Sequence, residues 1–303
     1  MPTNEMTKTR LEAITSSILQ PTAANGVQGR TGPFEQVIAG LTALITKHRE
    51  PGTEILRFPP VMSRALLEKS GYLKSFPHLL GVVSSMHGTE ADIRSLVEGR
   101  GGDRKWVDAL TATDLVLTPA ACYPVYPIVA ARGNVPVSGT MIDVESYCFR
   151  RETSSELGRM QAFRMREYVC IAAPQTALAF RERWKARAEQ LAKLLALPFK
   201  LVPASDPFFG RAGKLMAINQ VEQALKFELV IPVNSEEEPT ACMSFNYHQD
   251  HFGTTWGLRT DDGAIAHTAC AAFGMDRLGV ALFATHGLDL DAWPTTVREA
   301  LSL

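Results

Sequence analysis

The chain has 303 residues, of which 46% are hydrophobic and 21% are charged. This composition is typical of a globular enzyme and excludes disordered, collagen-like and disulfide-scaffold chains. The 31 Lys and Arg residues nearly balance the 32 Asp and Glu residues, and the net charge of −1 argues against a chain that wraps nucleic acid by bulk charge. The length suits one large domain or two small ones.

Five cysteines are spread along the chain without a Cys-x-x-Cys pair, so a structural zinc knuckle is not expected. The first residues mix charges of both signs and lack the apolar core of a signal peptide. The most apolar stretch, residues 116–131, contains prolines and is shorter than the roughly 20 residues of a membrane-spanning helix. We therefore expect a cytoplasmic protein with free thiols and no membrane partner.

Periodicity predicts a helical lead-in over residues 1–53, with helices at 11–19 and 34–47, and a main domain over residues 54–303. The main domain begins with a strand, a double proline and an amphipathic helix that ends near Gly71. The strand-like stretches are residues 123–132, 137–148, 160–172, 227–233, 241–247 and 256–259.

The clearest helix follows Pro174 and ends before Pro198. Its apolar stripe consists of Leu178, Trp184, Ala188, Leu191 and Leu195. A last helix begins near Phe273. Successive strands with few helices between them indicate an α+β fold, with a mainly antiparallel sheet flanked by helices.

The segment from Cys148 to Val169 combines side chains that suit a nucleotide. Arg150 and Glu152 are two apart and would share one face of a strand, and the next strand could place Phe163 and Glu167 over the same surface. An Arg binds phosphate, a carboxylate accepts from an adenine amino group, and a Phe stacks on the base. The alternative is a surface hairpin with compensating ion pairs.

Gly274 precedes a helix whose first turn carries Asp276 and Arg277. A helix N-terminus with an Arg in its first turn favours phosphate. The alternative is a buried helix with an ordinary N-terminal Asp. In the preceding strands, Lys226 and Glu238 could bracket a polyphosphate and its Mg²⁺, or could be part of a charged loop.

Cys122, Glu167 and Cys270 lie on three different predicted elements. Zinc accepts thiolates and a carboxylate together, and three protein ligands leave a fourth position open. The alternative is that the cysteines are core residues. His248 and His251 form a competing candidate for a metal pair.

These segments, in this order, resemble the catalytic core of a class II aminoacyl-tRNA synthetase of the seryl type. "CFRRE" and "AFRMRE" are similar to motif 2, "AAFGMDRL" to motif 3, "LRFPPV" to motif 1, and "ALKFELVIP…EPTACMS" to the strand pair before motif 3. The resemblance covers roughly residues 55–290. The two cysteines and Glu167 fall where the zinc-dependent, archaeal-type seryl enzymes have their ligands.

Two departures narrow the resemblance. Only a short helical lead-in precedes motif 1 and motif 3 ends close to residue 303, so we expect neither a tRNA-gripping domain nor an anticodon module. A truncated, zinc-bearing, seryl-like core resembles the bacterial amino acid:[carrier protein] ligases. These ligases adenylate glycine or alanine and load it onto the phosphopantetheine thiol of a small acidic carrier protein. The alternatives are a tRNA-charging enzyme reduced to its core and a non-catalytic sensor; no tRNA is expected as a partner.

The resemblance also implies roles for individual residues. Arg150 would bind the α-phosphate of ATP and Arg277 the γ-phosphate, and both are the expected catalytic residues. Glu152 would bind the adenine amino group, Phe163 would stack on the ring, and Arg159 is a second phosphate candidate. Further nucleotide contacts would come from Met160, Lys226, Ala241, Cys242, Met243 and Ser244, with Glu238 holding Mg²⁺.

The same resemblance implies that Cys122, Glu167 and Cys270 hold Zn²⁺, with Glu167 and Ser244 next to the amino acid. It also implies a homodimer through motif 1. The helix after Pro174 carries a surplus of positive charge, so we expect Arg181, Arg183, Lys185 and Arg187 to contribute to docking of the acidic carrier. The alternative is that this face is simply solvated.

Overall fold

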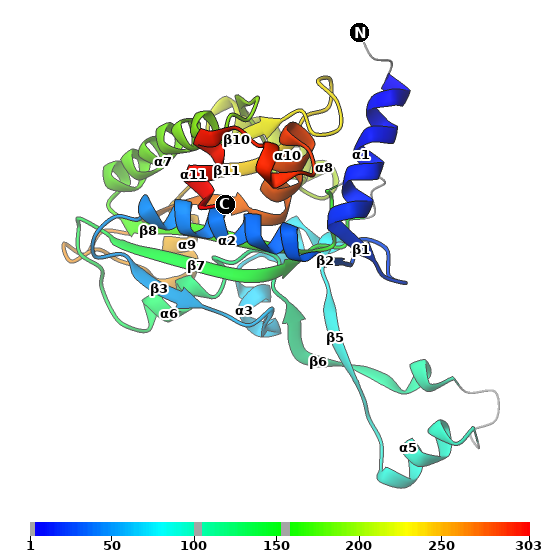
Figure 1. The fold of residues 1–303 in the computed structure, drawn as a ribbon. Coiled ribbons are helices and arrows are strands. Elements are labelled where there is room, and N and C mark those ends of the chain that lie inside the picture. Colours follow the sequence, from blue (N-terminus) through cyan, green and yellow to red (C-terminus); the bar gives the residue numbers. More distant parts are fainter. Residues whose placement is uncertain (1–3, 100–104, 153–157) are drawn as a thin grey trace.

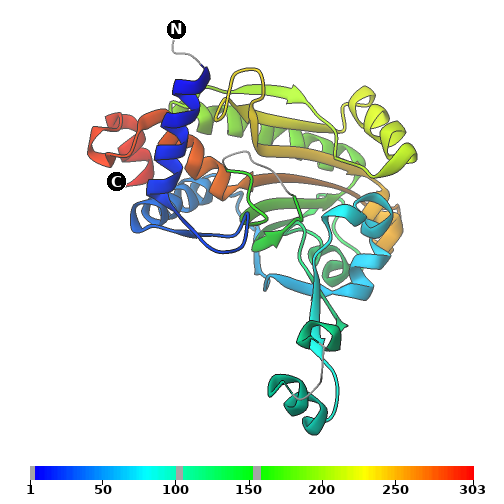
Figure 2. The same cartoon turned by 90° about the vertical axis from the view of Figure 1, so that its right-hand side faces the viewer.

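A seven-stranded sheet forms the centre of the computed structural model, which describes residues 4–99, 105–152 and 158–303 (Figures 1 and 2). All neighbouring strands are antiparallel except β3, which runs parallel to β7. In sheet order, the strands are β3 (Glu54–Arg57), β7 (Thr140–Phe149), β8 (Ala162–Ala172), β12 (His267–Gly274), β11 (Thr240–Gln249), β10 (Lys226–Ile231) and β9 (Lys200–Pro203). The expected α+β architecture is therefore confirmed.

One face of this sheet is covered by four helices, which bury the larger hydrophobic core (Figure 1). They are α2 (Gly32–Lys47), α7 (Pro174–Leu194), α10 (Met275–His286) and α11 (Thr295–Leu301). The Trp184 ring of α7 stacks on Tyr168 of β8 with centroids 4.2 Å apart. Such aromatic pairs contribute beyond the area that they bury, so α7 is firmly fixed to the sheet.

The opposite face carries a second core beneath α6 (Val125–Ala130) and α9 (His251–Trp256). The Tyr126 ring of α6 stacks on Phe252 of α9 with centroids 4.1 Å apart. Beside it lies a three-stranded sheet of β4 (Val61–Ser63), β6 (Leu110–Leu117) and β5 (Val82–Met86), with α3 (Arg64–Lys69) and α4 (Tyr72–Ser75). Helix α8 (Gly210–Glu222) follows β9.

Strands β5 and β6 extend away from the body with α5 (Glu90–Val97) as an arm (Figures 1 and 2). At the N-terminus, α1 (Asn4–Ile18) leads into the hairpin of β1 (Leu19–Pro21) and β2 (Gln28–Arg30). Short 3₁₀ turns complete the fold at Pro77–Leu79, Trp106–Ala109 and Leu290–Ala292.

The lead-in packs into the same core as the main domain. Phe34 of α2 is fully buried and stacks near Phe283 of α10, with centroids 6.1 Å apart. A Cβ at Gly279 would come within 2.7 Å of the Phe34 ring, so the close approach of α2 and α10 depends on a glycine. The division at residue 53 remains a prediction.

Three sequence-based expectations were wrong in detail. Residues 125–130 form helix α6, because a run of β-branched residues after Pro124 fits a buried helix as well as a strand. Trp256 ends helix α9, and Arg259 makes only an isolated bridge with Ile265. Arg150 lies just after β7, and Glu152 follows it in the loop, so the expected common strand face does not exist.

Within the described part of the chain, we find no helix with the length and apolar character needed to cross a bilayer.

Helix α7 provides a direct test of this packing. Trp184 is buried, whereas Leu178, expected on the same stripe, is 39% exposed. Replacing Trp184 with Ala leaves a cavity and is expected to lower the free energy of unfolding by about 3–5 kcal/mol. Leu178→Ala, on the same helix, should change it by less than about 0.5 kcal/mol. Denaturant midpoints of both variants test this, and equal losses would contradict the packing described here.

Candidate active site

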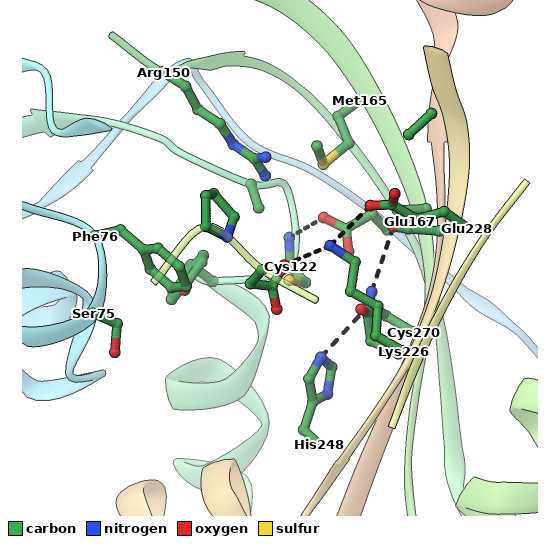
Figure 3. A pocket seen from close by; sticks show the side chains of 18 of the residues that line it. Ser75, Phe76, Cys122, Arg150, Met165, Glu167, Lys226, Glu228, His248 and Cys270 are labelled. Carbon is green, nitrogen blue, oxygen red and sulfur yellow. Dashed lines mark hydrogen bonds and ion pairs between the residues drawn. The ribbon is translucent and has the colours of Figure 1, made fainter. Parts of the chain in front are cut away.

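A cavity of about 400 Å³ lies against the sheet face that carries α6 and α9 (Figure 3). Strands β8, β10, β11 and β12 supply its floor. Its walls come from α4, α8, α9 and the turn that contains Cys122. A concave site of this size, lined by convergent polar groups, is the usual form of a small-molecule site.

The sheet register arranges the floor in two transverse rows, because directly opposite residues in antiparallel strands project to the same face. In the first row Glu228 pairs with Ser244, Ser244 with Ala272, and Ala272 with Glu167. In the second row Lys226 pairs with Asn246, and Asn246 with Cys270. Polar side chains from four strands thereby meet on one surface.

Cys122, Glu167 and Cys270 come together at one part of the cavity, as the sequence predicted for these residues (Figure 3). The backbone N–H of Cys122 donates to Glu167 Oε1 at 2.9 Å. A hydrogen bond to Cys270 and burial raise the pKa of the Cys122 thiol well above its usual value. Burial also raises the pKa of the Glu167 carboxyl.

The pKa of Cys270 is lowered by its hydrogen bond with Cys122, but burial and the charge of Glu167 outweigh this and raise it overall. Burial thus shifts the two thiols and the carboxyl toward their neutral forms, and the three groups share hydrogen bonds. A cation between them would reverse this preference, since thiolate and carboxylate are the charged forms that it stabilises. Among the described residues, no group of three His, Cys, Asp or Glu side chains is positioned to hold a metal ion.

His248 lies next to this cluster. Its Nε2 is 3.8 Å from Cys270 Sγ, and its Nδ1 is 3.0 Å from Thr268 Oγ1. The Asn246 side chain also donates to Cys270 Sγ at 3.3 Å. Burial lowers the pKa of His248 to about 4, so the ring is neutral at pH 7. Asn246 was missed in the sequence, although its place on the floor follows from the register of β11 and β12.

Three of the expected nucleotide-binding side chains, Arg150, Phe163 and Arg277, line the same cavity. The Arg150 guanidinium donates to the Pro119 carbonyl at 2.9 Å and lies 5.7 Å from the Phe163 ring centroid. Arg277 donates to the Ala241 carbonyl at 3.0 Å. Two guanidinium groups beside an aromatic ring form a surface suited to a nucleotide triphosphate.

Glu152 and Arg159 lie at the edge of this region rather than on the cavity wall. Arg159 donates to Glu152 Oε2 at 3.2 Å, and Arg277 Nη2 lies 3.9 Å from the same oxygen. The carboxylate thus stands between two arginines that are expected to contact phosphate.

Lys226 is buried and forms ion pairs with Asp206 Oδ1 at 2.6 Å and Glu228 Oε1 at 3.0 Å. Burial alone would lower the pKa of Lys226, but these two carboxylates raise it. Sequence reasoning missed both partners. Glu228 could have been inferred from its period-2 spacing with Lys226, whereas Asp206 precedes α8 and carried no signal.

Ala241, Cys242, Met243 and Ser244 also line the cavity, as expected. Met160 and Glu238 are not among its described lining residues. Met160 is buried in the core beneath α10, and Glu238 is exposed in the loop before β11. The loop's charge pattern predicted a metal-binding Glu, but it could not show which way the loop folds.

Helix α7 packs on the face of the sheet opposite to the cavity. The Arg181 side chain is buried and donates to the Ala224 carbonyl, which excludes it from a docking surface. Arg183 and Arg187 form ion pairs with Glu50, and Lys185 with Glu182. The charges of Arg183, Lys185 and Arg187 are therefore balanced by carboxylates of the same chain.

Comparison with known proteins places this arrangement in a family. The chain is 58% identical over 295 residues to amino acid–[acyl-carrier-protein] ligase 1 of Bradyrhizobium diazoefficiens, covering 97% of this chain and 90% of that protein. Ligase 2 of the same organism is 54% identical over 295 residues, covering 97% and 88%. The chain belongs to the amino acid–[acyl-carrier-protein] ligases. It is therefore an enzyme of the ligase class, which confirms the sequence-based expectation.

More distant relatives explain the fold. A type-2 serine–tRNA ligase of Methanopyrus kandleri is 30% identical over 200 residues, covering 61% of this chain and 37% of that protein. The M. kandleri SerRS solved with A. aeolicus tRNASec superposes with a TM-score of 0.80 and 23% identity, over 99% of this chain and 60% of that chain. The fold is that of class II aminoacyl-tRNA synthetases. No protein-family model matches the chain.

The partly buried His248 predicts a pH dependence of stability. Its folded-state pKa of about 4 lies below the ordinary value of 6.5, so stability is fully present above pH 6.5 and falls as the pH drops from 6.5 towards 4. The loss from this group should reach about 3 kcal/mol. The unfolding free energies of the wild type and of His248→Asn should be measured at pH 7 and at pH 4.5. The change in their difference between the two pH values gives the contribution of His248. A pH-independent difference between the two proteins would contradict this assignment.

Proposed function

We propose that this ligase activates a small amino acid with ATP and transfers it to the phosphopantetheine thiol of a carrier protein. The observation that carries the proposal is one cavity whose lining combines two arginines and an aromatic ring with two cysteines and a carboxylate. The relatives are named for ligation of amino acids to acyl carrier protein, and a Pyrococcus horikoshii seryl-tRNA synthetase of the same fold was solved with ATP, with a TM-score of 0.65 and 14% identity.

The first step requires positioning and charge neutralisation rather than a protein nucleophile. The carboxylate oxygen of the amino acid attacks the α-phosphorus, and pyrophosphate leaves. Arg150 would neutralise charge on the α-phosphate, Arg277 would bind the γ-phosphate, and Phe163 would stack on adenine. Glu152 would accept from the adenine amino group, with Arg159 as a further phosphate contact.

In the second step the carrier thiol sulfur attacks the carbonyl carbon of the adenylate. The carbon–sulfur bond forms, the bond to the phosphate oxygen breaks, AMP leaves, and the thiol proton passes to solvent. Ser244 and Lys226 line the cavity floor beside the strand pair that carries Glu167. We propose that they help to orient the reacting carbonyl.

We also propose that Cys122, Glu167 and Cys270 hold Zn²⁺. The fit rests on the donor set, since two thiols and a carboxyl from three separate elements share hydrogen bonds in a buried wall of the cavity. When bound, zinc with an open position would hold the neutral α-amino group of the substrate. Asn246 and His248 would support Cys270 from outside the ligand set.

Glycine or alanine is the proposed substrate. Such a substrate offers no large side chain to grip, and one methylene changes binding by only about 1–3 kcal/mol. Recognition through the amino group and carboxylate is therefore the physical solution. Mg²⁺ is proposed to accompany ATP, with Glu238 as its expected ligand, although that residue would have to approach the cavity from its exposed loop.

The carrier must approach from the cavity side, and α8 lies there. Met216, Asn219 and Gln220 of α8 line the cavity, while Leu215 is 67% exposed and Ile218 is 54% exposed. Arg211 and Lys214 on the same helix are exposed and basic. We propose α8 in place of α7 as the docking surface, because apolar contacts together with positive charge suit a small acidic partner.

A homodimer is proposed on the resemblance of residues 55–60 to motif 1. Sedimentation of the pure protein should give a mass near twice 33.2 kDa. A concentration-independent monomer would contradict this proposal.

Amino-acid-dependent ATP–pyrophosphate exchange tests the activity. Glycine or alanine should support exchange, and holo carrier protein should then gain the mass of one residue by mass spectrometry. Arg277→Met should lower kcat/KM for exchange by about 100-fold, since a transition-state charge contact is lost. Exchange that leads to tRNA loading and not to carrier loading would overturn the proposed acceptor.

Metal analysis tests the zinc proposal with a matched control. Cys122→Ala and Cys270→Ala should each lose the bound zinc and the exchange activity. Cys170→Ala removes a buried thiol of the opposite core and should retain both. Active wild-type protein without zinc would refute the proposal.

Charge reversal tests the docking surface. Arg211→Glu combined with Lys214→Glu should raise KM for the carrier at least about tenfold and leave pyrophosphate exchange unchanged. The matched pair Arg183→Glu and Lys185→Glu on α7 should alter neither reaction. If only the α7 pair weakened carrier loading, docking would be assigned to α7.

A further inference from the structure

One of the residues that line the cavity is a buried carboxylate, Asp276, which joins two arginines from distant parts of the chain. The Asp276 side chain is 1% exposed. Its oxygens accept from Arg30 Nε at 2.7 Å and Nη2 at 3.1 Å. They also accept from the Arg164 backbone N–H at 2.6 Å, from its Nη2 at 2.7 Å and from its Nε at 3.2 Å. Burial alone would raise the pKa of Asp276, but these arginines lower it.

Two of the three members of this cluster are adjacent in sequence to a residue of the proposed nucleotide site. Asp276 directly precedes Arg277 in the first turn of α10, and Arg164 directly follows Phe163 in β8. Arg30 ends β2 in the N-terminal lead-in. The carboxylate therefore ties the lead-in to the two segments that carry the expected adenine and γ-phosphate contacts.

Arg30 makes further contacts that hold the start of β8. Its Nη2 donates to the Ala162 carbonyl at 3.3 Å and contacts Met160 Sγ at 3.8 Å. The same hairpin accepts from the Gln161 backbone N–H through the Gly26 carbonyl at 2.8 Å. Residues 160–162, which lead into β8, are thereby fixed by residues of the lead-in.

We infer that Arg30 is a positioning residue for ATP, acting through Asp276 on Arg277. This inference rests on the proposed function. Among the described residues, the Arg277 guanidinium donates one hydrogen bond, to the Ala241 carbonyl at 3.0 Å, and it lies 3.9 Å from Glu152. The direction of the Arg277 side chain therefore depends on the position of the first turn of α10. Asp276 fixes that turn through its buried hydrogen bonds. Without Arg30, the carboxylate keeps Arg164 but loses its bond to the lead-in.

Removal of Arg30 is expected to weaken the binding of ATP more than the binding of AMP. Arg277 is expected on the γ-phosphate, whereas AMP has neither the β- nor the γ-phosphate. A shift of about 1 Å at a positioned group can cost about 100-fold in rate. Loss of Arg30 should therefore weaken ATP binding and ATP-dependent exchange more than AMP binding, which a general loss of stability would not do.

The test uses the full chain, with ATP and AMP affinities from calorimetry and exchange kinetics with glycine and alanine. Arg30→Met should lower ATP affinity and kcat/KM for ATP by about 10- to 100-fold and should lower AMP affinity by a clearly smaller factor, because AMP retains only the contact with Phe163 of the two contacts next to the cluster. Arg30→Lys, which keeps the charge but not the paired donors, should recover part of the loss. Arg132→Met removes an ion pair with Glu54 at 2.7 Å and serves as the control with unchanged binding.

Thermal unfolding of each variant checks that it is folded, and Arg30→Lys provides the measurement if Arg30→Met is not. Equal losses of ATP and AMP affinity, or an unchanged ATP affinity in a folded Arg30 variant, would overturn the inference while wild-type exchange still supports the proposed function. Absence of wild-type exchange would overturn the proposed function and this inference together.

Discussion

Strand β8 pairs antiparallel with β12 so that Glu167 stands opposite Ala272, with Cys270 two residues earlier on β12. Because cross-strand neighbours share a face, this register brings the carboxyl and one thiol to the same wall of the cavity. The Cys122 backbone closes on Glu167 from the turn before α6. A slip of one residue would turn Glu167 into the opposite core and separate the three side chains.

The alternation of side chains along β8 also places residues with different roles on the two faces of the strand. Phe163 and Glu167 line the cavity. The guanidinium groups of Arg164 and Arg166 donate to α2 and form ion pairs with Asp276 and Asp143, although Arg164 also contributes to the cavity lining. Buried pairs of this kind add little net stability, but removing one partner is costly, so they fix geometry more than they strengthen the fold. The ion pairs of Arg164 and Arg166 therefore fix the strand that carries Phe163 and Glu167.

Much of this arrangement could be predicted from sequence because its signals are local or ordered along the chain. The motif order indicated the fold, and period 2 placed Phe163 and Glu167 together. Contacts between distant segments carried no such signal: Asp206 reaches Lys226 from the segment before α8. Helix α6 was mistaken for a strand because short runs of Val, Ile and Tyr do not distinguish the two, and the packing that decides between them is tertiary.

The proposed recognition of the substrate amino group depends on a Zn²⁺ ion held by Cys122, Glu167 and Cys270. X-ray absorption at the zinc K-edge of the active, purified enzyme tests this directly. We expect a site with two sulfur neighbours at about 2.3 Å and lighter oxygen or nitrogen neighbours at about 2.0–2.2 Å. An active enzyme whose metal has no sulfur neighbour would contradict the assignment and remove the physical basis for recognising the amino group.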